Sequence, residues 1–288
     1  MIRTPLAVIV LTFNEEANLR FCLDSVKDWA DQIFIVDSFS TDRTLEIAGE
    51  YTDNIHQNPW RDWAHQRNWA LEHLPLQHDW VLFLDADERL TEGLRREMAA
   101  VLAGGPSPDG FYIRRHFFFL GKWLRHGGYQ KDYVLRLVRR QKARSLGSGA
   151  REYVTVQGAL GKLQHPMVHE DRKGLGFWVD KHNKLASLEA LELQGFAENH
   201  PGLLGTLETA ESRRIEHRAR IWLRERVWVR LPGLIRPIFY FLYRYVFQLG
   251  FLDGKEGLIY CFLHGFWYPF LIDAKYLELK KGVPPPGP

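Results

Sequence analysis

The chain has 288 residues, of which 45% are hydrophobic and 25% are charged, and its formal net charge is +3. This length can bury one large core with an appended region, and the near balance of charge gives no reason to expect a nucleic-acid partner. Two cysteines, Cys22 and Cys261, lie far apart without a CxxC spacing, which argues against a disulfide framework or a cysteine zinc site and fits a reducing compartment.

The N-terminal part of the chain alternates between short apolar runs and segments whose apolar residues have helical spacing. The first apolar run begins within a few residues of Met1, so we expect no signal peptide and a cytoplasmic location. The predicted strands are 6–12, 32–36, 54–56 and 80–84, and the predicted helices are 15–29 with Asn14 as its cap, one that starts before Leu45, and one that contains 65–71. Successive units of this kind predict a parallel sheet, and ligands bind at the carboxyl ends of the strands in such sheets.

Two closely spaced carboxylates follow the apolar run 80–84. Asp85 and Asp87 are two residues apart, so in an extended chain their side chains leave on the same face and can hold one hard cation, which would share its oxygen ligands with a diphosphate. The alternative is an acidic turn in which Asp87 or Glu88 starts a helix from Thr91. The neighbouring motifs favour the cation site.

Three motifs occur in a fixed order along the chain: VIVLTFNEEANL at residues 8–19, IVDSFSTDRT at 35–44 and VLFLDADE at 81–88. In this order and spacing they resemble the family 2 glycosyltransferases of GT-A fold. The resemblance covers roughly residues 5–190 and is closest to bacterial enzymes that add sugars to lipopolysaccharide core or other envelope glycans. One departure is that Ser38 and Phe39 stand where the family has acidic and glycine residues.

The resemblance implies a nucleotide-sugar donor bound at the ends of the first two strands. Thr12, Phe13 and Glu15 would frame the base and the ribose, and Asp37 would accept a hydrogen bond from the base. Arg67, on the helix before the acidic strand, would also reach the nucleotide. For this helix a solvated face is the alternative interpretation.

The resemblance also implies a divalent cation. Asp85 would lie near the ribose and the metal, Asp87 would ligate Mg²⁺ or Mn²⁺, and Asn68 would accompany Arg67 into the site. His169 would close the metal shell from the far side, with a histidine that orients a neighbour as the alternative. Elementary chemistry agrees, because a departing nucleotide diphosphate builds negative charge that a divalent cation neutralises.

The second half of the catalytic region should meet the acceptor. Strands are predicted for 110–123 and 134–140. An inverting transferase needs a carboxylate that takes the proton from the attacking hydroxyl. Glu152 stands where related enzymes have a His-Glu pair, although Arg151 replaces the histidine; Glu170 and Asp171 are the alternatives.

The C-terminal region has a different composition. A long helix is predicted from 177, and an arginine-rich amphipathic helix is predicted over 213–230. The aromatic segments 231–251 and 257–272 are too charged or too short for the roughly 20 apolar residues of a membrane span. Aromatic rings beside arginines are typical of the headgroup boundary of an anionic membrane. A helical subdomain or an oligomer interface is the alternative.

We therefore predict an α/β GT-A domain over 1–200, with a nucleotide-sugar half over about 1–105 and an acceptor half over about 106–200, followed by a helical region over 201–288 at a membrane surface or in an oligomer. The expected reaction is metal-dependent, inverting transfer of a sugar, most simply from a UDP donor, to a hydroxyl of a lipid-linked or lipopolysaccharide-type glycan at the inner face of the cell membrane. Transfer to a polyprenyl phosphate and a non-catalytic nucleotide-sugar-binding scaffold are the alternatives.

Overall fold

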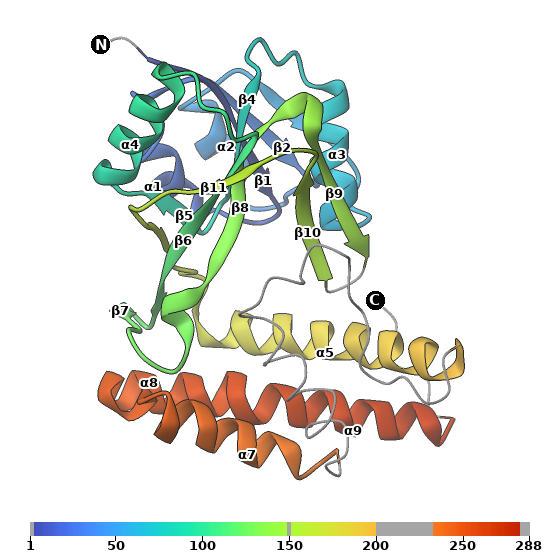
Figure 1. Cartoon of the computed structure of the whole chain (residues 1–288). Helices are drawn as coiled ribbons and strands as arrows, with labels where there is room; N and C mark the ends of the chain where they lie inside the picture. The colour runs from blue at the N-terminus through green and yellow to red at the C-terminus, as the bar shows by residue number, and fades with distance from the viewer. Residues whose placement is uncertain (1–2, 149–150, 200–232, 283–288) are drawn as a thin grey trace. The chain divides into compact units, whose positions relative to one another are not determined.

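The computed structural model describes residues 3–148, 151–199 and 233–282, and the chain divides into two compact units (Figure 1). The first unit consists of Met1–Arg125 with Tyr129–Gly174, and the second consists of His126–Gly128 with Leu175–Pro288. The predicted boundaries near residues 105 and 200 stay predictions.

Four parallel strands form the nucleotide half of the sheet, as predicted, and the α/β class is confirmed. The strand β1 (Thr4–Thr12) pairs with β2 (Ala30–Asp37) on one side and with β4 (Trp80–Asp85) on the other, and β3 (Ile55–Gln57) pairs with β2. In register, Thr12 lies beside Asp37 and Asp37 lies beside Gln57. The carboxyl ends of these strands therefore bring their last residues to one edge.

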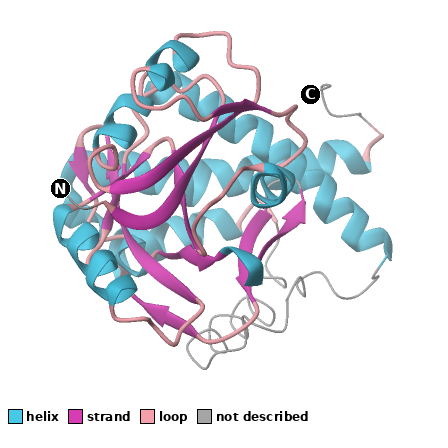
Figure 2. Ribbon diagram, turned by 90° about the horizontal axis from the view of Figure 1, so that it is seen from above, coloured by secondary structure: helices cyan, strands magenta, loops and turns pink. Residues whose placement is uncertain are grey.

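Beyond β4 the sheet continues with strands in mixed directions, and its strands are twisted, as Figure 2 shows. The strand order is β3-β2-β1-β4-β8-β6-β12-β5, with β7 and β11 also paired to β6. The strands predicted for 110–123 and 134–140 correspond to β6 with β7, and to β8. The remaining bounds are β5 (Glu88–Leu90), β6 (Gly110–Phe119), β7 (Lys122–Trp123), β8 (Tyr133–Arg139), β11 (Leu160–Lys162) and β12 (Met167–His169), while β9 (Ala143–Ser148) and β10 (Arg151–Val156) form a separate antiparallel pair.

Both faces of the parallel strands are buried. Val8 and Val10 of β1 belong to a core shared with α1 and α4, whereas Ile9 belongs to a core shared with α3 and with β9 and β10 (Figure 1). The period of two along a strand alternates the faces, so burial on both sides explains the continuous apolar run in the sequence. The helices of this unit are α1 (Leu19–Asp24), α2 (Thr44–Gly49), α3 (Trp63–His73) and α4 (Glu92–Ala103), with short 3₁₀ turns at Tyr129–Lys131 and Arg140–Lys142.

The helix predicted for 15–29 is shorter in the structure. It covers only Leu19–Asp24, its N-terminal flanking residue is Asn18, and Asn14 does not cap it. Asn14 instead adopts a left-handed backbone with φ of 52°, and its Oδ1 accepts a hydrogen bond from the Thr41 amide at 2.8 Å. Asparagine side chains compete with helical bonding in this way, and residues 16–18 form a turn in which the Asn18 and Leu19 amides donate to the Glu15 carbonyl at 2.9 and 2.8 Å.

The second unit is helical in its described part. Helix α5 (Gly174–Asn199), which the sequence predicted from 177, packs its Trp178 against Tyr260 and its His182 against Tyr268, with ring centroids 6.1 and 5.1 Å apart. The other elements are α7 (Arg236–Leu242), α8 (Gly254–Phe262) and α9 (Tyr268–Lys280), with π-helical turns η4 (Tyr243–Phe247) and η6 (Leu263–Trp267) and the 3₁₀ turn η5 (Gly250–Asp253). No helix in the described residues has the length and apolarity to span a bilayer. The predicted helix at 213–230 lies outside the described residues.

Candidate functional site

The Asp37 carboxylate ties together the ends of three parallel strands. Asp37 is fully buried; its Oδ1 accepts from Thr12 Oγ1 at 2.9 Å and from Ser40 Oγ, while its Oδ2 accepts from the Ser40 amide at 2.8 Å and from Gln57 Nε2 at 3.3 Å. A carboxylate has about four acceptor positions, and these four donors fill them. The predicted hydrogen bond from a base to Asp37 stays a prediction. The exposed Gln57 amide at the same edge was missed, because a glutamine in a short strand carries no sequence signal.

The Asp85 carboxylate, at the end of β4, is held between two arginines. Arg67 Nη2 donates to its Oδ1 at 2.6 Å, and Arg136 Nη2 donates to its Oδ2. Burial alone would raise the pKa of Asp85, but Arg136 and Arg67 outweigh burial and lower this pKa. Asp85 is therefore ionised at neutral pH, and both of its oxygens are engaged by guanidinium groups.

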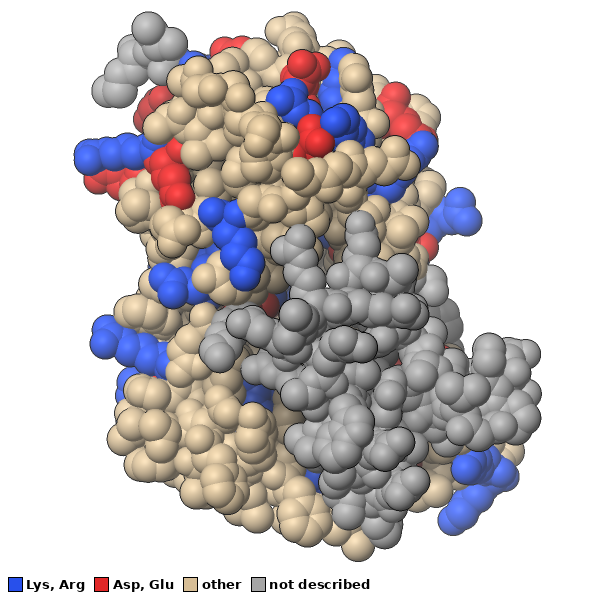
Figure 3. Space-filling view, in the orientation of Figure 1, with Lys and Arg blue, Asp and Glu red and all other residues tan. Residues whose placement is uncertain are grey.

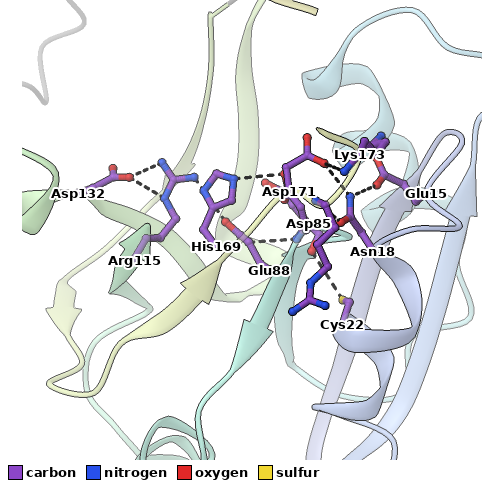
Figure 4. Close-up of polar contacts among 12 residues, drawn as sticks. Glu15, Asn18, Cys22, Asp85, Glu88, Arg115, Asp132, His169, Asp171 and Lys173 are labelled. Atoms are coloured by element: carbon purple, nitrogen blue, oxygen red, sulfur yellow. Dashed lines mark hydrogen bonds and ion pairs between the residues drawn. The ribbon is translucent and has the colours of Figure 1, made fainter. Parts of the chain in front are cut away.

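These contacts belong to a longer chain of alternating charges. Arg136 also donates to Glu88 Oε1 at 2.8 Å, and Arg115 contacts Glu88 at 3.5 Å. Arg115 also contacts Asp132 at 2.6 Å (Figure 4). Glu88 and Arg136 are 1% and 5% exposed, so each is a buried charge, and the opposite charge of the other compensates for the loss of hydration. In order of contact the chain runs Glu152, Arg67, Asp85, Arg136, Glu88, Arg115, Asp132. The sequence did not predict Glu88, Arg115, Asp132 or Arg136 as residues of the site.

The helix α3 supplies both Arg67 and Asn68, but they do different things. Arg67 is 3% exposed and bridges Asp85 and Glu152, so the alternative of a solvated helix face is wrong for it. Asn68 donates to the Ser145 carbonyl at 2.8 Å and accepts from the Ser145 amide at 2.9 Å. Asn68 thus fastens α3 to β9, which keeps the Arg67 side chain in place beside Asp85.

Asp87 and His169 form the part of the site that suits a divalent cation. The pairing of β12 with β5 sets His169 beside Glu88 in register, and His169 Nε2 lies 3.2 Å from Asp87 Oδ2. Burial alone would lower the pKa of His169, but the Asp87 carboxylate outweighs burial and raises this pKa. The buried Nδ1 of His169 has no hydrogen-bond partner within the described part of the chain.

This donor set fits Mg²⁺ or Mn²⁺, which favour carboxylate oxygens. No group of three or more His, Cys, Asp or Glu side chains gathers at metal-binding distance among the described residues. Mg²⁺ is normally bound through one or two carboxylates, with substrate phosphates and water filling its other positions. Asp87 and His169 are residue types that such a shared site uses, and a metal role for them stays a prediction.

The loop after β12 folds back onto the loop between β1 and α1. The buried Asn18 donates from Nδ2 to Glu15 Oε2 at 2.9 Å and to Asp171 Oδ1 at 3.1 Å, and Lys173 Nζ lies 2.6 Å from Glu15 Oε1 (Figure 4). Burial raises the pKa of Glu15 to about 7, against the lowering effect of Lys173. Residues far apart in sequence therefore meet beside the predicted nucleotide site.

Each of the three candidate base carboxylates is held by neighbouring groups. Glu152, on β10, accepts from Arg67 Nη1 and Ser145 Oγ. Glu170 is paired with Arg89 at 2.7 Å and Arg172 at 2.8 Å; burial alone would raise its pKa, but these two arginines lower it. Asp171 accepts from Asn18 and from the Lys173 amide. Only Glu152 of the three shares a guanidinium with Asp85, and its role as base stays a prediction.

Comparison with known sequences gives a family-level match. The model of the family described as "Glycosyl transferase family 2" matches residues 7–155. The lipopolysaccharide core biosynthesis glycosyltransferase LpsC of Rhizobium meliloti (strain 1021) is 30% identical over 201 residues, which cover 65% of this chain and 71% of that protein. An uncharacterized glycosyltransferase of Rickettsia typhi is 35% identical over 98 residues, which cover 34% of this chain and 33% of that protein.

Solved structures give weaker likenesses. S. aureus TarS 1–349 in complex with UDP-GlcNAc has a TM-score of 0.46 at 14% identity, with 98% of this chain and 92% of that chain covered. Glucosyl-3-phosphoglycerate synthase from Mycobacterium tuberculosis, in complex with Mn²⁺, UDP and phosphoglyceric acid, has a TM-score of 0.44 at 17% identity, with 66% and 77% covered.

Proposed function

The chain belongs to glycosyl transferase family 2, and from this premise we propose that it transfers a sugar from a UDP-linked donor to a hydroxyl of a lipid-linked or lipopolysaccharide-type glycan, with inversion and with a divalent cation. The observation that carries the proposal is the placement of Asp85, Asp87 and His169 at the carboxyl edge of the parallel strands, beside Thr12 and Asp37. The acceptor class follows the name of the relative LpsC.

Different residues at this edge would carry out different parts of the transfer reaction. When bound, Mg²⁺ or Mn²⁺ would neutralise the charge that develops on the leaving diphosphate, and Asp87 with His169 would hold it. Arg67 and Arg136 keep the Asp85 carboxylate ionised and fixed in orientation. Glu152 would take the proton of the acceptor hydroxyl, and its hydrogen bonds from Arg67 and Ser145 orient it.

A non-catalytic scaffold of the same fold is the alternative from another class. A buried chain of charges around Asp85 is costly to desolvate, and perturbed carboxylates of this kind cluster at catalytic sites, which favours catalysis. Purified protein should release UDP from a UDP-sugar in Mn²⁺ and stop in excess EDTA. Tight UDP-sugar binding without any turnover, across several donors and acceptors, would favour the scaffold. Polyprenyl phosphate as an acceptor is tested in the same assay.

Glu152→Gln should lower turnover by about 10² or more, because the amide oxygen can still accept from Arg67 and the amide NH2 can donate to Ser145 Oγ, but the side chain cannot take the acceptor proton. Donor affinity should change little. Rates of UDP release with acceptor and the Kd for UDP, measured on the same preparation, check this. Glu72→Gln is the matched control, since Glu72 also pairs with an arginine, Arg144, but is 48% exposed.

If Glu152→Gln turns over normally while Asp171→Asn or Glu170→Gln does not, the base lies in the loop after β12 instead. A thermal melt of each variant separates loss of a proton acceptor from loss of the fold.

We further propose that the second unit places the enzyme at the inner face of the cell membrane. Along α7 and η4, large apolar side chains recur every three or four residues and are each 41–75% exposed: Ile235, Ile238, Phe239, Leu242, Tyr243, Val246 and Phe247. In Figure 3 the surface over α7 and α8 carries few charged side chains. No acidic residue occurs in 233–252, and the next one, Asp253, is buried against His126. An apolar stripe without exposed acids fits an anionic headgroup layer.

The protein should float with vesicles of anionic lipid, and less with neutral vesicles or in high salt, because salt screens only the electrostatic part. Leu242→Ser should weaken flotation about fivefold, the factor that about 1 kcal/mol of lost apolar burial gives. Leu146→Ser is the control, since Leu146 is 45% exposed on β9 of the first unit and Leu242 is 41% exposed. The contrary outcome is a stable oligomer in detergent-free buffer that does not bind vesicles and that dissociates with Leu242→Ser. That result would show that the apolar stripe contacts a second copy of the chain and not a membrane.

A further inference from the structure

Phe39 combines two features that folding does not explain. Its backbone has φ of 61°, in the left-handed region that bulky residues rarely adopt, and its side chain is 51% exposed. The strained backbone is unfavourable, and the exposed ring gains little from burial. Backbone strain that the surrounding residues maintain is found most often at functional sites.

The loop that carries Phe39 is held firmly. Ser40, the next residue, is bound through its amide and its hydroxyl to the buried Asp37 carboxylate, and its Oγ accepts from the Asn14 amide at 2.8 Å. Thr41 donates from its amide to Asn14 Oδ1 at 2.8 Å. The loop after β2 is thus fastened on both sides of Phe39, so the left-handed conformation is fixed by its neighbours.

The same bonds connect this loop to a second exposed ring. Asn14, which also has a left-handed backbone, follows Phe13 at the end of β1, and Phe13 is 55% exposed. Phe13 and Phe39 are therefore carried by cross-linked loops at the carboxyl ends of adjacent parallel strands, next to the Thr12 to Asp37 hydrogen bond. Both side chains are more than half exposed.

We propose that Phe39 is a stacking face for the nucleobase of the donor, and that it contributes to donor affinity together with Phe13. This inference rests on the proposed function, which puts a nucleoside diphosphate at this edge. Donors from Thr12, Ser40 and Gln57 already fill the acceptor positions of the Asp37 carboxylate. A hydrogen bond from the base to Asp37 therefore cannot supply all of the affinity for the base, and stacking supplies the rest. A flat π surface suits every base, and Gln57, an exposed residue in register with Asp37, lies at the same edge.

The test separates the ring from the backbone. Binding of UDP in Mn²⁺ is measured by calorimetry for Phe39→Tyr, Phe39→Leu and Phe39→Gly. We expect the tyrosine variant to bind within about twofold of the original chain, and the leucine and glycine variants to bind at least about fivefold more weakly, as loss of one base stack implies. The glycine variant should melt at the same or a higher temperature, because glycine accepts positive φ without strain.

Leu120→Gly is the matched control. Leu120 is 55% exposed with φ of 49°, in the turn between β6 and β7, so the same backbone change is made without removing a ring from the strand ends. Its UDP affinity should be unchanged. Equal UDP binding by the original chain, Phe39→Leu and Phe39→Gly would overturn the inference alone. Failure of the original chain to bind any nucleoside diphosphate would instead overturn the proposed function.

Discussion

Asp87→Ala is expected to abolish sugar transfer, by a factor of at least about 10², while the chain stays folded. Asp87 lies two residues beyond Asp85, which ends β4, and its Oδ2 lies 3.2 Å from His169 Nε2. Loss of metal assistance removes several kcal/mol of transition-state stabilisation, and each 1.4 kcal/mol is about tenfold in rate. The side chain is small and lies at the site rather than in the core, so its removal takes away a ligand and little packing.

The measurement is UDP release in Mn²⁺ with and without acceptor, beside UDP affinity with and without the metal. The variant should lose the metal dependence of UDP binding as well as turnover, which a general loss of structure would not produce. Asp53→Ala, an exposed aspartate in the turn between α2 and β3, is the control. Full activity of Asp87→Ala in Mn²⁺, or of the original enzyme in excess EDTA, would contradict the metal assignment.

Arg136→Ala is expected to lower the free energy of unfolding by about 3–5 kcal/mol, the range for breaking a buried ion pair from one side. Arg136 is 5% exposed and contacts both Asp85 and Glu88, and Glu88 is 1% exposed. Removing the guanidinium leaves two carboxylates close together, with Arg67 and Arg115 on their outer sides. Chemical denaturation followed by circular dichroism measures the loss.

A second variant tests whether charge is the cause. Arg136→Met with Glu88→Gln removes one charge of each sign and keeps similar volumes, so it should recover at least about half of the stability that Arg136→Met loses. Arg144→Met is the control, because Arg144 is 59% exposed in its pair with Glu72 and should leave the denaturation midpoint nearly unchanged. If Arg136→Ala behaves like Arg144→Met, the charge chain does not stabilise the fold.

The sequence alone was sufficient for the parallel half and for part of the site. Apolar runs such as 80–84 are long enough and buried enough to be recognised locally, and the alternation of strands and helices limits the sheet to parallel pairing. Residues that end such strands must then meet at one edge. For this reason Thr12 and Asp37 could be placed together from the sequence, and the structure joins them by a hydrogen bond.

Local patterns gave the wrong bounds for the first helix, next to side chains that bond to distant loops. The sequence predicted a helix over 15–29, but α1 covers only Leu19–Asp24. Asn14 bonds to the loop after β2, and Asn18 bonds to Asp171 and to the Arg172 amide. These partners lie more than a helical turn away in sequence, so helical periodicity cannot predict these contacts.

The arrangement of charges around Asp85 was decided by the tertiary structure. Arg136 reaches Asp85 because β8 pairs antiparallel with β4, and His169 reaches Asp87 because β12 pairs antiparallel with β5. Sequence periodicity identifies a strand and its faces, but it does not state which strand lies beside it or in which direction. The residues at the strand ends were therefore determined by the sequence, whereas the arginines that hold Asp85 follow from strand pairing over long distances along the chain.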